Sequence, residues 1–387
     1  MKLLILAGEE SGVHYAERIA AAVRARRPDA EVRGYGDYGF KTADLAVFGI
    51  WAVVRRIFFF LRVKRTMERA MREWRPDVVC TVDYPGMNLK LAAYAKSLGI
   101  KAVHVVCPQV WAWHQGRIPK IERSLDRLCC FFPFEPSIFR EGLATFVGHP
   151  LAQEFAAGET AAPDAAGGTF GDWREKGLVA LLPGSRLGEI EKHLPTLLEA
   201  VAPLKGVRVV IPAANDRARA AIERIAAKLQ TLQPPNPPTL QPSKPLNIQT
   251  SKLPNLTIQS GGARDILRRA DVAAVASGTA TLEAALARCP TVLVYKVSPL
   301  LAAFLRRAIT GVKHVGLANI IAEKSGAACP MPELLQENFT AEATRAYLEK
   351  WLSDPAARTE AVEKLDCALK KLENIGDSYA KIAEFLV

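Results

Sequence analysis

Residues 274–286 read AVASGTATLEAAL, so a buried strand, a turn of small residues and the start of a helix follow one another directly. Residues 271–276 are apolar enough for the strand, and the small side chains at 277–279 let the backbone approach a ligand closely. A helix that begins within 279–281 leaves its first backbone amides without partners inside the helix. Such amides, together with the neighbouring hydroxyl groups, favour a bound phosphate. The stretch therefore predicts a nucleotide diphosphate site between a strand and a helix.

Glu283 lies about one helical turn beyond this predicted phosphate site. It is poorly placed to face a phosphate, but a carboxylate at that point can accept hydrogen bonds from the hydroxyl groups of a ribose. On this stretch alone a second interpretation stays open, namely a capped core helix that binds nothing.

The same alternation of strand, turn and helix occurs along the whole chain. Residues 2–26 open with it, and strand 77–82, helix 88–98 and strand 102–106 continue it. A second series begins with a strand at 178–182. Such alternation predicts α/β domains with parallel, doubly wound sheets, whose ligands gather at the carboxyl ends of the strands. Gly8, Glu9, Asp83 and Gln109 all come just after predicted strands, and we expect them to share one cleft.

Chain length predicts two domains, because 387 residues exceed the size at which a single core usually stops growing. We expect an N-terminal Rossmann-like domain at 1–165, a second at 172–335, and C-terminal helices at 336–387 that return to the first domain. Within the second domain, segment 231–254 is dense in proline and holds polar near-repeats. Prolines at that density oppose helices and ladders, so we expect a disordered insertion there.

Net charge is +11 with an isoelectric point near 9.3, which suits an anionic substrate, a membrane surface or nucleic acid. Nucleic acid is disfavoured, since we find neither zinc-finger spacing nor a basic stripe interleaved with aromatics. No segment approaches the roughly 20 apolar residues of a spanning helix. Residues 1–7 imitate a signal peptide, but their apolar run is short, so we interpret them as a first strand. The seven cysteines show no paired metal-ligand spacing, which is typical of a reduced, cytosolic protein.

Residues 48–65 form the most hydrophobic stretch, and basic residues punctuate it. A helix of this kind could lie in a lipid headgroup layer or accept acyl chains. A core helix with an exposed basic edge explains the pattern equally well. The predicted membrane or acyl contact consists of Ile57, Phe58, Phe59, Phe60 and Leu61.

Two further segments contain candidate site residues. Trp111 and Trp113 could line a sugar or acyl pocket, although aromatic side chains in such a loop also serve plain packing. His149 precedes a proline and could act as a base, but a hydrogen-bonded structural histidine is the favoured interpretation.

Five motifs occur along the chain in the same order as in one known family. They are LLPGSR at 181–186 with Glu189 and Ile190, ASGTATLE at 276–283, the segment from Val103 to Trp113, FPFE at 132–135 and VGHP at 147–150. Together they resemble the lipid-A-disaccharide synthases, along nearly the whole chain except the proline-rich insertion. The resemblance implies an inverting glycosyltransferase of the GT-B type, with two Rossmann-like domains facing a cleft, at the inner face of the cytoplasmic membrane. The implied reaction joins UDP-2,3-diacylglucosamine to 2,3-diacylglucosamine 1-phosphate, and it releases UDP and a β-1′,6-linked disaccharide.

The resemblance also implies roles for individual residues. Asp83 matches the family's proposed base, and Arg186 matches its essential arginine. The implied donor and UDP site consists of Gly184, Ser185, Arg186, Ser277, Gly278, Thr279, Thr281, Glu283 and Asn319. The implied acceptor side of the cleft consists of Gly8, Glu9, Ser11, Gly12, Asn88, Gln109 and Trp111.

Two departures from the family pattern affect the acceptor side. Val13 stands where the opening motif has aspartate, and Gly86 with Met87 alters the motif that follows Asp83. Family members can also form dimers through C-terminal segments, so a homodimer is an available assembly.

The chemistry agrees with these assignments. Displacement at an anomeric carbon needs a base for the acceptor hydroxyl, which a carboxylate at a strand end can provide. Charge develops on the departing diphosphate, and Arg186 with a helix N-terminus can stabilise it. We expect no metal and no cofactor, because no acidic pair stands where a metal-dependent sugar transferase holds its cation. Two alternatives remain: another GT-B enzyme that uses UDP-N-acetylglucosamine, or a silent nucleotide- or lipid-binding protein.

Overall fold

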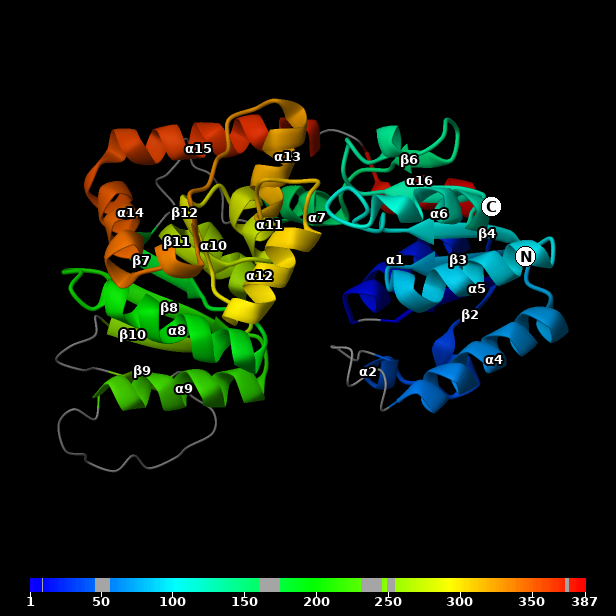
Figure 1. Cartoon of the computed structure of the whole chain (residues 1–387), viewed down its shortest axis with the longest axis horizontal. Coiled ribbons are helices and arrows are strands. Elements are labelled where there is room, and N and C mark those ends of the chain that lie inside the picture. The colour runs from blue at the N-terminus through cyan, green and yellow to red at the C-terminus, as the bar shows by residue number, and fades with distance from the viewer. Residues whose placement is uncertain (9, 46–55, 160–174, 231–245, 249–254, 373–375) are drawn as a thin grey trace. The chain divides into compact units, whose positions relative to one another are not determined.

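The computed structural model describes residues 1–8, 10–45, 56–159, 175–230, 246–248, 255–372 and 376–387. The chain divides into two compact units (Figure 1). The first contains Met1–Glu154 together with Leu372–Val387, and the second contains Phe155–Lys371. Each unit is built on a largely parallel sheet, so the predicted α/β class with two such sheets is confirmed.

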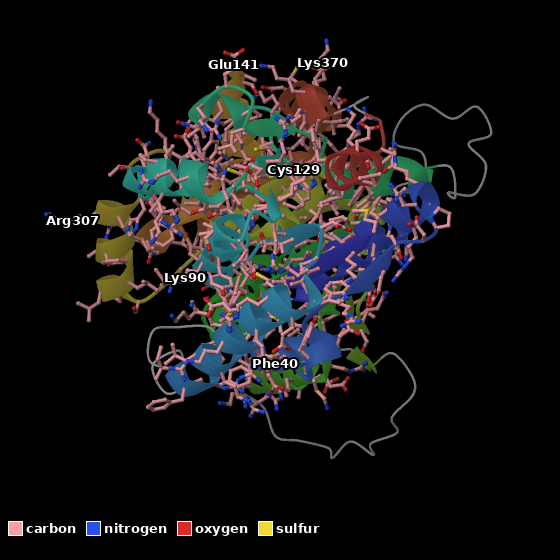
Figure 2. The ribbon with its side chains drawn as sticks, turned by 90° about the vertical axis from the view of Figure 1, so that its right-hand side faces the viewer. Phe40, Lys90, Cys129, Glu141, Arg307 and Lys370 are labelled. Atoms are coloured by element: carbon pink, nitrogen blue, oxygen red, sulfur yellow. The ribbon has the colours of Figure 1, made fainter. Side chains whose placement is uncertain are left out.

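The first unit has a six-stranded sheet in the order β2-β1-β3-β4-β5-β6, and all of its pairings are parallel. Its central strands are continuous apolar runs, as expected when helices cover both faces of a parallel sheet. Cys129 in β5, for example, is fully buried (Figure 2). The strands are β1 Lys2–Ala7, β2 Glu31–Arg33, β3 Val78–Val82, β4 Lys101–Val105, β5 Arg127–Cys130 and β6 Ala144–Phe146.

The helices of the first unit pack into two cores on this sheet. One core joins the strands to the N-terminal helix α1 and the C-terminal helix α16, whose Ile382 and Leu386 are fully buried. The other core joins them to α4, α5 and α6. The helical segments are α1 Glu10–Arg26, η1 Tyr35–Tyr38, α2 Thr42–Leu45, α4 Ile57–Trp74, α5 Pro85–Ser97, η2 Gln115–Arg117, α6 Ile118–Ser124, η3 Pro136–Ile138 and α16 Ser378–Leu386. Helix α7, Pro150–Glu159, begins in the first unit and ends in the second.

The second unit has a seven-stranded sheet in the order β13-β12-β11-β7-β8-β10-β9. Its strands are β7 Glu175–Leu182, β8 Arg208–Ala213, β9 Leu246–Ile248, β10 Asn255–Ser260, β11 Ala270–Ala276, β12 Thr291–Tyr295 and β13 Glu333–Leu335. Its helical segments are α8 Leu187–Val201, α9 Asp216–Gln230, α10 Ala263–Arg269, α11 Thr279–Leu286, α12 Pro299–Ala308, α13 Leu317–Ser325, η4 Gln336–Asn338, α14 Ala341–Ser353, α15 Pro355–Leu369 and η5 Lys370–Leu372.

The edge strand β9 corrects the expectation of a wholly disordered insertion at 231–254. Leu246–Ile248 pairs antiparallel with β10, and Ile248 lies opposite Leu256. No proline lies within these three residues, since Pro245 precedes them and the next proline is Pro254. An edge strand also needs hydrogen bonds to a neighbouring strand on one side only. Residues 231–245 and 249–254 lie outside the described residues.

Of the residues 336–387 that we expected to return to the first domain, only Leu372–Val387 belongs to the first unit. Helices α14 and α15 belong to the second unit, and α16 belongs to the first. The side chain of Asp377 caps α16 by accepting hydrogen bonds from the amides of Tyr379 and Ala380. An ion pair of 2.8 Å between Arg26 and Glu384 joins α16 to α1. None of the helices in the described part of the chain has the length and hydropathy that crossing a bilayer requires.

Candidate active site

Asp83 stands at the carboxyl end of β3, where the backbone is held in an unusual conformation. Asp83 and Tyr84 have φ angles of 48° and 51°, which non-glycine residues rarely adopt. The amide of Asp83 donates to the carbonyl of Val105 at 2.9 Å, and its carboxylate Oδ1 accepts from the amide of Tyr84 at 2.8 Å. Such strain persists only where the surroundings impose it, and it clusters at functional sites.

The environment of the Asp83 carboxylate suits a general base. The side chain is half-buried, and burial raises its pKa, while the hydrogen bond from Tyr84 acts in the opposite direction. A carboxylate with a raised pKa accepts a proton more readily.

Asn88 fixes the turn that carries Asp83. Its side chain is fully buried, and its Nδ2 lies 2.8 Å from the carbonyl oxygen of Asp83 and 3.0 Å from that of Val82. Nδ2 also lies 3.1 Å from the carbonyl of Leu6, and Oδ1 accepts from the hydroxyl of Tyr35 at 2.9 Å. Asn88 therefore links the ends of β1 and β3 and holds the Asp83 turn in position.

The other residues predicted for the acceptor side of the cleft lie in different settings within the first unit. Gly8 must be small, because a Cβ there would come within 2.5 Å of the Tyr84 ring. Gly12 lies buried in α1, which begins at Glu10, whereas the sequence pattern predicts a turn over residues 8–12. Glu9 lies outside the described residues, as does the side chain of Ser11.

The two departures from the family pattern are also in different settings. Val13 packs against the core that α1 shares with α16. Gly86 is exposed near the start of α5, and a Cβ added there would meet nothing within 4 Å.

Trp111 lies in the interior, whereas Gln109 beside it is exposed. The indole Nε1 of Trp111 donates to Oε1 of Glu135 at 3.0 Å, and its ring meets that of Phe134 edge-on at 5.5 Å. Packing of the aromatic segment therefore accounts for Trp111. His149 is also buried, and its Nδ1 accepts from the amide of Leu151 at 3.2 Å, which agrees with a structural histidine.

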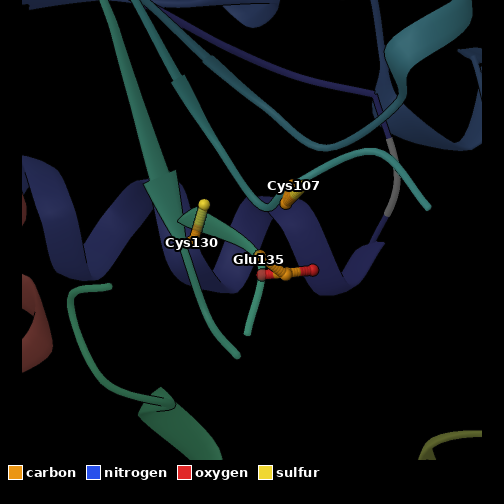
Figure 3. A group of neighbouring side chains, drawn as sticks. All are labelled: Cys107, Cys130 and Glu135. Carbon is orange, nitrogen blue, oxygen red and sulfur yellow. The ribbon is translucent and has the colours of Figure 1, made fainter. Parts of the chain in front are cut away.

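Cys107, Cys130 and Glu135 form a buried group whose potential ligand atoms lie within 4.8 Å of one another (Figure 3). Thiolates and a carboxylate could in principle hold a metal ion. Both carboxylate oxygens already accept protein hydrogen bonds, however, one from Trp111 and the other from the amide of Phe132 at 3.0 Å. The thiol of Cys107 donates to the carbonyl of Pro108. These contacts explain the group as a structural part of the fold, without a metal ion.

Glu135 should make stability depend on pH. Burial raises its pKa from 4.5 to about 8, so the folded protein binds a proton there that the unfolded chain releases. Its contribution to stability is therefore full below about pH 4.5 and falls as pH rises to about 8. The effect is on the order of a few kcal/mol, since one pKa unit corresponds to about 1.4 kcal/mol.

Glu135→Gln should flatten this dependence, because the amide stays neutral. The measurement is the free energy of unfolding between about pH 6.5 and 8. Below that range the buried His104 and His149, with pKa values lowered to about 3 and about 4, act in the opposite direction. An equal slope in both proteins over the upper range would show that Glu135 does not titrate there.

In the second unit, Gly184 to Arg186 form the turn between β7 and α8. Gly184 has a φ of 117°, and a Cβ there would come within 2.5 Å of the Glu189 carboxylate, so only glycine fits. Glu189 accepts from the Arg186 amide at 3.3 Å and pairs with the Arg186 guanidinium at 3.1 Å. The Arg186 side chain is 60% exposed, so it can also reach an anionic ligand. Ser185 is exposed beside it.

His193 supports this turn, and our sequence analysis missed it. Its Nδ1 lies 2.8 Å from the carbonyl of Pro183, and its Nε2 accepts from the amide of Lys296 at 3.0 Å. Because Nε2 accepts, Nδ1 carries the proton and donates it. The buried ring thus ties the Pro183 turn to the end of β12. A histidine on the apolar face of α8, seven residues after Arg186, was the available signal.

The turn from β11 into α11 has the predicted form. Gly278 has a φ of 145°, and Gly278 and Thr279 are exposed at the start of the helix. The Ser277 hydroxyl donates to the carbonyl of Val315 at 3.1 Å. Thr281 is buried, and its hydroxyl donates to the Gly278 carbonyl at 2.8 Å. The exposed part of the predicted phosphate site is therefore the backbone of the turn together with Thr279.

Glu283 and Asn319 are held by protein partners near this turn. Glu283 pairs with Arg264 at 3.1 Å and is only 17% exposed. Asn319 is fully buried, and its Nδ2 donates to Glu333 at 2.8 Å. Glu333 also accepts from the amide of Gly316 at 3.0 Å, so Asn319 and Glu333 together position the loop before α13.

A family model described as lipid-A-disaccharide synthetase matches residues 3–384. The chain belongs to the lipid-A-disaccharide synthase family. A lipid-A-disaccharide synthase of Myxococcus xanthus is 34% identical over 379 residues, which cover 94% of this chain and 91% of the relative. A lipid-A-disaccharide synthase of Neisseria meningitidis serogroup A is 35% identical over 387 residues, which cover 95% of this chain and 94% of the relative.

Solved structures of lower identity share the fold. The glycotransferase of kitacinnamycin is 15% identical with a TM-score of 0.58, covering 100% of this chain and 98% of its own. MurG of Acinetobacter baumannii is 14% identical with a TM-score of 0.54, and the match covers 99% of this chain and 98% of the MurG chain. These matches over nearly the full length confirm the GT-B fold predicted from the sequence.

Proposed function

We propose that this chain transfers a diacylglucosamine unit from UDP-2,3-diacylglucosamine to 2,3-diacylglucosamine 1-phosphate. The products are UDP and a β-1′,6-linked disaccharide, the reaction that the resemblance to lipid-A-disaccharide synthases implied. The observation that carries the proposal is the family match over residues 3–384. The alternatives, another UDP-N-acetylglucosamine enzyme or a silent binding protein, are less favoured for the same reason.

In the proposed mechanism Asp83 removes the proton of the acceptor's 6-hydroxyl group. The hydroxyl oxygen then forms a bond to the anomeric carbon of the donor, and the bond from that carbon to the diphosphate breaks with inversion. Arg186 and the backbone at the start of α11 stabilise the negative charge on the departing UDP. Support comes from the raised pKa of the half-buried Asp83 and from the exposed turn at Gly278.

The function is tested by incubating the purified chain with a panel of UDP-sugars, each with monoacyl and diacyl acceptors, and measuring UDP release. UDP release only with the diacylated pair supports the proposal. Release with UDP-N-acetylglucosamine alone would support an enzyme of the rival class, and no release with any pair would support a silent binding protein.

We also propose that the chain binds peripherally to the inner face of the cytoplasmic membrane, partly through α4. Phe58 is 83% exposed, and Ile57 and Leu61 beside it are exposed as well. Arg62 and Arg65 are exposed at positions that continue the Phe58 face. Apolar side chains next to cationic ones suit a headgroup layer.

The remaining aromatic side chains of α4 face inward. Phe60 is buried, and Phe59 meets Phe40 edge-on at 6.0 Å. The proposed lipid contact therefore concentrates on Ile57, Phe58 and Leu61.

Helix α12 of the second unit carries the same combination of side chains. Leu300 is 87% exposed, and Phe304, one turn further on, is exposed as well. Arg307 continues the same face and projects from the surface (Figure 2). Both helices thus support the proposed membrane association.

Changing Phe58 and Leu61 together to serine should weaken binding to vesicles of phosphatidylcholine mixed with phosphatidylglycerol by about tenfold or more, because two apolar side chains no longer enter the lipid. Val387→Ser is the matched control, since Val387 is exposed and apolar but directly follows the C-terminal helix α16. Equal vesicle binding by all three proteins would count against a lipid contact at α4.

A further inference from the structure

We propose that a cationic pocket between α5 and α6 binds the phosphate group of the acceptor, a sugar 1-phosphate. This inference rests on the proposed function and adds a substrate subsite to it. The pocket lies wholly within the first unit and has a volume of about 250 Å³.

The charges around the pocket all have one sign. Lys90 of α5, Arg117 at the end of η2 and Lys120 of α6 line it, and no aspartate or glutamate is among its lining residues. Lys90 and Lys120 are exposed, and Arg117 is half-buried (Figure 2 labels Lys90). Three cations that line one pocket with no acid among them favour an anionic ligand.

None of these three cations has an ion-pair partner among the residues that the structure describes. On the same helix as Lys90, Lys96 pairs with Asp126 at 2.8 Å. Within the part of the chain that the structure describes, no carboxylate lies within 4.0 Å of the side-chain nitrogens of Lys90, Arg117 or Lys120. Their charges therefore stay available to a ligand.

The floor of the pocket is apolar. Leu89, Ala93 and Ile121 supply it, and Leu89 and Ile121 belong to the core on this face of the sheet. Sites for whole drug-sized ligands occupy roughly 300–1,000 Å³. A pocket of about 250 Å³ is thus a subsite for a phosphate and the adjoining part of a sugar, and not for an entire diacylated molecule.

The position of the pocket connects it to the base. Pro85 and Gly86 line it, and they follow the strained turn of Asp83 and Tyr84 directly. The acceptor carries its 1-phosphate and its reactive 6-hydroxyl group on one sugar ring. A phosphate subsite beside the Asp83 turn would therefore hold the acceptor with that hydroxyl group close to the base.

The test combines changes in the pocket with changes in the substrate. Lys120→Gln and Arg117→Gln should each raise the KM for the 1-phosphorylated acceptor by about tenfold or more, because each removes a charge-assisted hydrogen bond to phosphate. The KM for the UDP-sugar should stay unchanged. With 2,3-diacylglucosamine lacking the phosphate as acceptor, the variants and the original protein should perform alike.

Two further variants act as controls. Arg123→Gln removes the same charge from α6, but Arg123 is exposed outside the pocket, so the KM should not change. Arg117→Lys keeps the positive charge, so its KM for the phosphorylated acceptor should lie between those of Arg117→Gln and the original protein.

The outcomes separate the subsite from the function. If the original protein is active, and its variants lose the same share of activity on acceptors with and without the phosphate, the subsite is overturned. The proposed function would then still stand. The variants could instead keep the acceptor KM but bind more weakly to vesicles that contain phosphatidic acid. That result would assign the pocket to a lipid headgroup, and it would also overturn the proposed acceptor subsite. No turnover of the original protein with any acylated pair would contradict the proposed function, while vesicle binding would still be measurable.

Discussion

Asp83→Asn should lower turnover by about 10²–10⁴, the usual effect of losing a general base, while UDP binding stays unchanged. The asparagine keeps the shape of the side chain, and its oxygen can still accept the hydrogen bond from the Tyr84 amide. The carboxylate alone is lost. The measurement is disaccharide formation at saturating substrate, together with a titration of UDP into the same protein.

The pH dependence of the original protein adds a second readout. Since burial raises the pKa of Asp83, the fraction of active carboxylate should rise with pH through that raised value, and the low-pH limb of turnover should follow it. Asp83→Asn should lose this limb. Near-normal turnover in Asp83→Asn would remove Asp83 from the chemistry.

Arg186→Ala should weaken both UDP binding and turnover. A hydrogen bond from a charged group contributes about 1.5–3 kcal/mol, so we expect a loss of roughly tenfold to a hundredfold in UDP affinity. Turnover should fall as well, because in the proposed mechanism the same guanidinium stabilises charge on the departing diphosphate. The two readouts are UDP titration and disaccharide formation.

The matched control is Arg224→Ala. Arg224 is also an exposed arginine of the second unit, and it pairs with Glu191 at 3.0 Å, as Arg186 pairs with Glu189. It should therefore reproduce the loss of a surface ion pair without loss of UDP affinity. If Arg186→Ala binds UDP and turns over like this control, the role of Arg186 at the diphosphate is excluded.

The β–α units were predictable because each signal was local. Buried strands of parallel sheets are continuous apolar runs, and β11 spans 270–276 against a prediction of 271–276. The small residues after it mark the turn, and α11 begins at Thr279, within the expected segment. The glycine at 184 was likewise visible, although the reason for it, the approach of Glu189, was not.

The roles of buried polar residues were not predictable in the same way. Asn88 and His193 each hold a loop through contacts with residues far away in the sequence, and Asn319 does so through Met331, 12 residues further on. A polar residue after a strand can face the ligand or turn inward to satisfy backbone groups, and sequence spacing does not distinguish the two. The pairing of β9 depends on a partner strand in the same way, so the proline-rich composition around it concealed it.

The structure of the product tests the central claim most directly. The purified chain should be given UDP-2,3-diacylglucosamine and 2,3-diacylglucosamine 1-phosphate, and the product's mass and anomeric configuration determined by mass spectrometry and nuclear magnetic resonance. The account predicts a tetraacylated disaccharide 1-phosphate with a β-1′,6 linkage, formed in equal amount to UDP. An α linkage, a different attachment point or unchanged substrates would contradict it.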